Sequence, residues 1–383
     1  MSIRVLELND LGLTLHEADR THALGAAAAA GQGKKLVFGQ EALDVSRVSP
    51  QEFNNRYIGA LNAQPLAARM GPAQNHADLV YHHLNAMDLG VEPLVIAVPS
   101  HFKNDQLGLL LGICQELSLE VRGFLDIPLA HALTAPSEQP FSVLDIELHR
   151  FSITHYEPVH DGETDKLTQV DNKVWDGRGV AHLLEGWMSS IADEFVQHTR
   201  FDPLHAGNTE QQLFAQTWGF LGTTLGDRVR IAIEANNDTR DLEIPRTLLI
   251  QKLHQRLEGI DLTGVQNLAL THRVQAIPGL DQWAEDLGFN VTNLDANDAL
   301  TTAMQQTASA LPEGQVIRLT AAEAAIDRTE NVSQTSDSTE TSDQPATHLL
   351  LDNVAKPVGD VHCAPGETIV VDGLTYTAIR VEH

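Results

Sequence analysis

Residues 142–154 read SVLDIELHRFSIT: a short apolar run that ends at Asp145, a polar turn, and a second run in which apolar and polar residues alternate. Alternation on both sides of a turn predicts a β-hairpin. Glycines are typical of a hairpin whose backbone approaches a ligand closely, because a side chain would occupy the space. Here Glu147, His149 and Arg150 stand in the turn. The stretch therefore predicts a hairpin whose turn is filled by side chains.

The sequence around this hairpin repeats one scheme twice. A strand-like opening at 3–19 is followed by an apolar strand at 93–100, an amphipathic helix that starts at Asn104 and another strand near 121–124. From residue 141 onward, three further strands again precede alternating helices and strands. This order predicts an α/β fold built from two related halves. The run Ala26–Ala30 between two glycines favours either a helix or a surface excursion.

Composition excludes several classes of protein. The chain has 383 residues, is 42% hydrophobic and carries 25 Lys+Arg against 52 Asp+Glu, a formal charge of -27, so we expect neither nucleic acid nor an anionic membrane as a partner. The two cysteines, Cys114 and Cys363, lie far apart, and the 18 histidines lack metal-site spacing. No secretion signal and no long apolar run is evident. We therefore expect a cytoplasmic protein without a dedicated metal site.

The sequence changes character after residue 326. Residues 327–347 are acidic and rich in Ser and Thr, which predicts a disordered linker because such a segment buries too little apolar surface to offset its ordering entropy. Residues 348–383 alternate around Asp372-Gly373 and predict a small β-rich tail.

Four segments in a fixed order resemble the actin-like ATPase superfamily, and most closely the nucleotide-binding domain of DnaK-type heat-shock chaperones. They are VPSHFKNDQLGLLLGICQELSLEVRGFLDIPLAHAL, LDIELHRFSIT, VQNLALTHRVQAIPGLDQWAEDLG and DANDALTTAM, and the resemblance covers about residues 1–310. It implies a two-lobed actin-like ATPase fold, which is a duplicated ribonuclease H-like fold. Lobe I would be residues 1–138, completed by about 296–326, and lobe II would be residues 139–295.

The resemblance also implies a nucleotide site. Backbone N–H groups of two hairpin turns would hold phosphates, and Asp10 and Asp145 would hold a hydrated Mg²⁺. The positions that correspond to the family's phosphate and nucleoside loops are Asp10, Gly12, Thr14, Asp145, Glu147, His149, Arg150, Gly177, Gly179, His272 and Arg273.

This chain departs from the family pattern at those loops. Side chains replace the family's glycines at Glu147, Leu148 and His149 and again at His272 and Arg273. A carboxylate at Glu147 would repel phosphate oxygens. Further departures are Leu13 for a hydroxyl residue, Arg150 for a threonine, Ser152 for an aspartate, Thr302 for a glycine and Ile127 for a glutamate.

We therefore expect a degenerate member, a pseudo-ATPase that needs no cofactor and acts as a scaffold, regulatory or chaperone-like binding module for protein partners. In that case Asp10 and Asp145 are polar residues that bond their own turns. The alternative is a slow Mg-dependent ATPase or a nucleotide-gated switch of the heat-shock chaperone type, with Mg-ATP held by Asp10, Asp145 and Arg150. His149 and His272 either form a functional pair or fill a cleft that no longer holds nucleotide. The sequence leaves open whether the protein is an enzyme, which proteins it binds and its oligomeric state.

Overall fold

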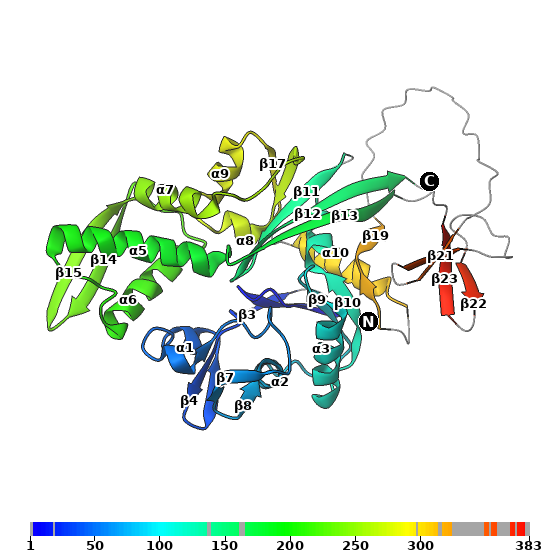
Figure 1. The fold of residues 1–383 in the computed structure, drawn as a ribbon, viewed down its shortest axis with the longest axis horizontal. Helices are drawn as coiled ribbons and strands as arrows, with labels where there is room; N and C mark the ends of the chain where they lie inside the picture. Colours follow the sequence, from blue (N-terminus) through cyan, green and yellow to red (C-terminus); the bar gives the residue numbers. More distant parts are fainter. Residues whose placement is uncertain are drawn as a thin grey trace. The chain divides into compact units, whose positions relative to one another are not determined.

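The computed structural model forms two compact units, Met1–Asp327 and Arg328–His383. The residues that it describes are 3–17, 20–135, 139–160, 165–295, 298–312, 316–323, 348–351, 354–357, 368–371 and 374–379. The linker expected at 327–347 lies outside these residues. The larger unit is α/β, as the sequence predicts (Figure 1).

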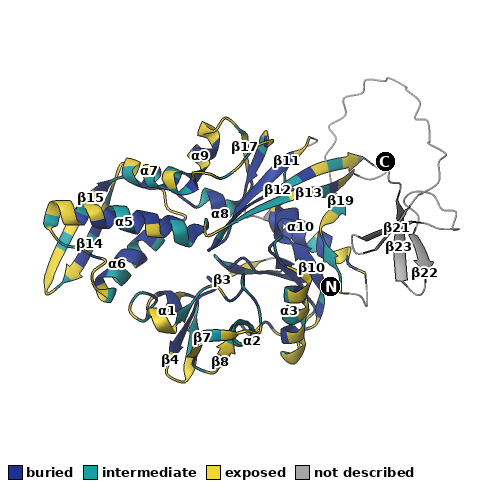
Figure 2. Cartoon of the chain, viewed as in Figure 1, coloured by how far each residue is buried: buried dark blue, intermediate teal, exposed yellow. Residues whose placement is uncertain are grey.

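The first half of the larger unit, residues 3–135, is built on a mixed sheet. Its strands are β1 (Arg4–Glu7), β2 (Leu13–His16), β3 (Thr21–Gly25), β9 (Leu94–Val98) and β10 (Val121–Asp126) in the order β10-β9-β1-β2-β3, with β18 (Arg318–Leu319) beside β10. β1, β2 and β3 are antiparallel, whereas β9 and β10 continue parallel to β1. Every residue of β9 is buried (Figure 2), in accord with its continuous apolar sequence.

The second half, residues 139–295, repeats this topology. Its strands are β11 (Phe141–Ile146), β12 (Arg150–His160), β13 (Asp165–Asp176), β16 (Asn267–Leu270) and β17 (Asn290–Asn293) in the order β17-β16-β11-β12-β13, with β19 (Ala321–Glu323) beside β13. Again three antiparallel strands come first in the chain and two parallel strands complete the sheet. The two sheets therefore share the same order and directions of strands, as the repeated sequence pattern predicts.

Helices pack on these sheets and between them. α4 (Ile127–Ala132) contacts both β10 and β11, so it joins the two halves. The other helices are α1 (Gln40–Leu43), the 3-10 turn η1 (Pro50–Glu52), α2 (His76–Ala86), α3 (Asn104–Glu116), α5 (Val180–Thr199), α6 (Gly207–Trp218), α7 (Arg246–Leu257), α8 (His272–Gln275), α9 (Leu280–Asp286) and α10 (Asp298–Ser309). Small sheets are formed by β4 (Ala29–Gln32), β5 (Lys35–Phe38) and β6 (Phe53–Asn54), by β7 (Pro65–Met70) and β8 (Ala73–Asn75), and by β14 (Arg228–Ala235) and β15 (Asp238–Pro245). Within the described residues, no helix has the length and apolar character needed to cross a membrane.

The segment expected to complete lobe I is divided between the two sheets. α10 contacts α4, β1 and β10, and β18 pairs with β10 of the first sheet. β19 instead pairs with β13 of the second sheet. The last segment of the larger unit thus adds one short strand to each of the two sheets.

The smaller unit contains one antiparallel sheet. Its strands are β20 (His348–Leu351), β21 (Val354–Pro357), β22 (Thr368–Val371) and β23 (Leu374–Ile379), in the order β21-β20-β23-β22.

The alanine run is neither helical nor on the surface. Ala26–Ala30 are at most 6% exposed and lead into β4. Ala26, Ala28 and Ala30 pack in a core that includes α5 and β11, whereas Ala27 and Ala29 pack in a core with β1 and β9. Because the methyl group is the smallest apolar side chain, alternating alanines let one strand lie between two cores.

The turn of the β11–β12 hairpin is held against the start of α5. The N–H groups of Val180 and Ala181 donate to the carbonyl oxygens of Glu147 (3.0 Å) and Leu148 (2.8 Å). Gly179 lies at the closest point, where an added Cβ atom would lie 2.5 Å from the Glu147 carbonyl oxygen. The backbone φ of Gly179 is -77°, so a lack of space, and not its backbone conformation, requires glycine here.

We predict that Gly179→Ala lowers the free energy of unfolding by about 2 kcal/mol or more, because rigid backbone atoms must move. The control is Gly108→Ala on the exposed face of α3, where an added Cβ meets nothing within 4 Å. That substitution should stabilise the protein by about 0.5–1 kcal/mol through helix propensity. Urea unfolding of both variants measures the difference, and equal effects would contradict the proposed contact.

Candidate functional site

Two acidic residues occupy matching positions in the two halves. In the β1–β2 hairpin Glu7 pairs with Thr14, and in the β11–β12 hairpin Asp145 pairs with Ser152; six residues lie between the partners in each case. The counterpart of Asp145 is therefore Glu7, three residues before Asp10. In the resemblance Asp10 and Asp145 together hold the metal ion, whereas the strand register matches Asp145 to Glu7. Thr14 lies on β2 opposite Glu7.

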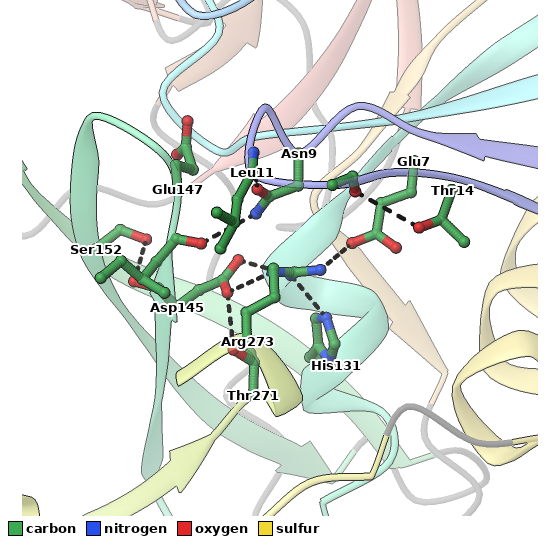
Figure 3. A network of polar contacts seen from close by, with 12 residues as sticks. Glu7, Asn9, Leu11, Thr14, His131, Asp145, Glu147, Ser152, Thr271 and Arg273 are labelled. Carbon is green, nitrogen blue, oxygen red and sulfur yellow. Dashed lines mark hydrogen bonds and ion pairs between the residues drawn. The ribbon is translucent and has the colours of Figure 1, made fainter. Parts of the chain in front are cut away.

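The guanidinium of Arg273 lies between the two acids (Figure 3). Arg273 Nη1 donates to Glu7 Oε1 at 2.5 Å, while Nε and Nη2 donate to the two oxygens of Asp145 at 2.9 and 2.8 Å. Thr271 Oγ1 donates to Asp145 Oδ1 at 2.8 Å, and His131 Nε2 lies 3.0 Å from Arg273 Nη2. Glu7, Asp145 and Arg273 are 1%, 4% and 6% exposed, so solvent does not screen their charges.

The charge of Arg273 keeps the two acids ionised and favours a neutral His131. Burial alone would raise the pKa of Glu7 and of Asp145. The Arg273 charge outweighs burial at both acids, helped by the hydrogen bond with His16 at Glu7 and by those from Arg273 and Thr271 at Asp145, so both pKa values lie below their usual range. Burial lowers the pKa of His131 to about 3, with a further contribution from Arg273. A neutral His131 can accept the hydrogen bond from Arg273 Nη2. His16 closes the other side of the cluster, since its Nε2 atom lies 3.1 Å from Glu7 Oε2.

Asp10 lies apart from this cluster, at the contact between the two hairpins. Its Oδ1 atom accepts a hydrogen bond from the Leu148 N–H at 2.6 Å, and its buried Oδ2 atom has no hydrogen-bond partner. Burial and the nearby Glu147 carboxylate raise the pKa of Asp10 to about 8, in spite of the Leu148 N–H and two arginines. Asp10 is therefore mainly a neutral carboxylic acid at pH 7.

Each residue from 146 to 149 in the turn of the β11–β12 hairpin contacts a residue of the first half of the unit. Asn9 Nδ2 donates to the Ile146 carbonyl at 3.2 Å, and the Leu148 N–H donates to Asp10 as described. The side chain of Glu147 contacts His101 Nε2 at 3.0 Å instead of pointing into an open cleft. His149 Nε2 lies 3.0 Å from Asn55 Oδ1. The two hairpins thus contact each other directly.

The remaining predicted residues have structural contacts. Arg150 pairs with Asp176 at 2.7 Å, and Gly177 has a positive φ of 72° in the loop before α5. Gly12 accepts a weak hydrogen bond of 3.5 Å from Thr14 Oγ1. His272 packs on His131 with ring centroids 5.6 Å apart.

His149 and His272 therefore have different partners, and the structure supports no functional pair between them. Burial lowers the pKa of each to about 4, so both are neutral at pH 7.

These residues do not fit Mg-ATP. If the Mg²⁺ ion were held by the two acids that match in strand register, Glu7 and Asp145, it would need the space that the Arg273 guanidinium occupies. A phosphate at the start of α5 would need the N–H groups of Val180 and Ala181, which already donate to the hairpin. Within the described residues, no group of three or more His, Cys, Asp or Glu side chains is arranged to hold a metal ion.

No protein-family model matches the sequence, and no curated protein matches it significantly. The site must therefore be interpreted from its own geometry. Sequence reasoning missed four members of the cluster: Glu7, His16, His131 and Thr271. A signal for Glu7 was available, since an acid at position 7 and a hydroxyl residue at 14 repeat the spacing of Asp145 and Ser152.

We predict that Arg273→Met lowers the free energy of unfolding by about 3–5 kcal/mol, because it leaves two buried carboxylates without a cation. Adding Glu7→Gln and Asp145→Asn to this variant should recover much of the loss. The control is Arg228→Met, which breaks an exposed pair with Glu243 and should cost at most about 1 kcal/mol. Urea unfolding measures all three variants, and equal losses in the two single variants would contradict the assigned role.

We predict that Asp10 destabilises the protein as the pH rises. A carboxyl group with a raised pKa binds its proton more tightly in the folded chain, so its stabilising contribution is complete below about pH 4 and is lost as the pH approaches about 8. Asp10→Asn stays neutral, so its melting temperature should rise relative to the native protein between pH 5 and 8. The exposed Asp193→Asn variant on α5 should follow the native pH profile. A constant difference between Asp10→Asn and the native protein would contradict the raised pKa.

Proposed function

We propose that this protein is a degenerate member of the actin-like ATPase superfamily, related to DnaK-type chaperones, which has lost ATP hydrolysis and acts in the cytoplasm as a scaffold or regulatory binding module. The observation that carries the proposal is the Arg273 guanidinium held by Glu7 and Asp145. A side-chain cation occupies the position between two matched hairpins where, in the proposed family, a metal ion and phosphates would bind.

The repeated topology supports the kinship. Both sheets have three antiparallel strands followed by two parallel strands, with an acid at the same register of each first hairpin. A duplicated unit of this kind agrees with the order of the four sequence segments that resemble the superfamily. The kinship is a proposal about fold, and function is argued from the site.

Contacts that close the site support the proposed loss of nucleotide chemistry. Arg273 places one guanidinium charge between the two acids and pairs with both, and the hairpin turns bond to each other through Asp10 and Asn9. Opening this space would expose or separate three buried charges, which is costly. A protein whose halves are held together in this way is suited to present a surface to a partner protein, and the β-sheet of the smaller unit offers a second surface for the same purpose.

The test is thermal unfolding of the full chain with millimolar Mg-ATP, Mg-ADP or Mg²⁺ alone. We expect the same melting temperature in all three, whereas a nucleotide at 100 times its Kd would add about 2.7 kcal/mol of stability. A known ATP-binding protein measured alongside confirms that the nucleotide is active. A Mg-dependent rise, with phosphate release that Asp145→Asn abolishes, would overturn the proposal and favour a slow ATPase or nucleotide-gated switch.

A further inference from the structure

A separate cavity of about 440 Å³ lies between the two halves, away from the Glu7–Arg273–Asp145 cluster. One wall comes from the segment 43–56, which contains η1, and the other from α5, α6 and the turn residues Leu148 and His149. Its size falls within the range of small-molecule sites. None of the three charged residues of the cluster lines it.

The cavity has an apolar lining suited to a flat ring system. Its apolar side chains include Leu43, Phe53, Leu148, Phe214 and Trp218. Aromatic walls favour stacking or edge contacts with an aromatic ligand. Trp218 is partly exposed, while Leu43, Leu148 and Phe214 are buried, so the apolar surface continues from the mouth inward.

The charges of the lining favour one negative group on the ligand. Arg47 is already paired with Glu185 and Glu210 and also lies over the Phe214 ring, with its Cζ atom 4.8 Å from the centroid. The exposed guanidinium of Arg56 forms no hydrogen bond or ion pair within the described part of the chain. The two glutamates would repel a polyanion, so Arg56 matches a single anionic group.

His149 adds a further polar group. Burial lowers its pKa to about 4, so the ring is neutral. Because Nε2 lies 3.2 Å from the Asn55 backbone carbonyl oxygen, which can only accept, the proton is assigned to Nε2. The other ring nitrogen, Nδ1, is then an acceptor. The lining therefore combines Arg56, which has no ion-pair partner among the described residues, with an acceptor and aromatic walls.

We propose that this cavity binds a small aromatic monoanion, such as an aromatic carboxylate or sulfonate, with Arg56 pairing the anionic group and Trp218 and Phe214 contacting the rings. Such a ligand touches both halves of the unit and therefore stabilises their closed arrangement. The inference does not depend on the ATPase kinship.

Two probes with the same ring system test it: 8-anilinonaphthalene-1-sulfonate, which is anionic, and N-phenyl-1-naphthylamine, which lacks the sulfonate. Fluorescence titration of the full chain measures both affinities. Arg56→Gln should weaken the sulfonate probe about tenfold and leave the neutral probe within about twofold, since a charge-assisted bond is lost. Ala181→Leu, which adds volume at a cavity-lining position of α5, should weaken both probes.

The matched control is Arg228→Gln, which removes a charge from an exposed arginine on β14 and should change neither affinity. Melting temperatures establish that each variant is folded. The proposal is overturned if Arg56→Gln weakens both probes equally, or if Ala181→Leu leaves both affinities at the native value.

Discussion

The ion pairs between Arg273 and the two acids Glu7 and Asp145 are the constraint on which the larger unit depends. Two carboxylates buried at 1% and 4% exposure cannot both stay ionised without a cation close by. Arg273 supplies that cation through three hydrogen bonds, and His131, His16 and Thr271 satisfy further polar atoms around it. Because Glu7 comes from one sheet and Asp145 from the other, the ion pairs connect the two halves.

Close backbone approach is the second requirement. The hairpins contact each other only because small residues lie around them: alternating alanines at 26–30 separate two cores, and Gly179 admits the carbonyl oxygen of Glu147. Gly59 differs, because an added Cβ atom there would meet the Arg150 guanidinium, the end of a flexible side chain that can shift. The small residues let the backbones of the two halves approach closely. The charged side chains of the turn, Glu147 and Arg150, form contacts within the protein.

Local patterns in the sequence were sufficient to predict the helices and strands of the fold, but not the contacts between residues of the site. Alternation and apolar spacing predicted the α/β class and the repeated order of strands and helices, because these depend on neighbours in the chain. Alanine run 26–30 was predicted as helix or surface, since its burial between two cores depends on residues more than 100 positions away. Asp10 was predicted from a short motif and Glu7 was not considered, although the strand pairing matches Glu7, and not Asp10, to Asp145. Arg273 was identified as a residue that fills a glycine position, yet its partners at 7 and 145 could not be read from spacing.

A tethered cation differs from a bound metal ion in one respect that bears on function. Mg²⁺ enters and leaves with its nucleotide, so the charge balance between two acids can change during a cycle and drive movement of the parts that hold them. The guanidinium of Arg273 is covalently part of α8, and its charge persists at every physiological pH. The balance at Glu7 and Asp145 is therefore constant. The group between the two hairpins that can change its charge near neutral pH is instead the carboxyl of Asp10, whose pKa lies near 8.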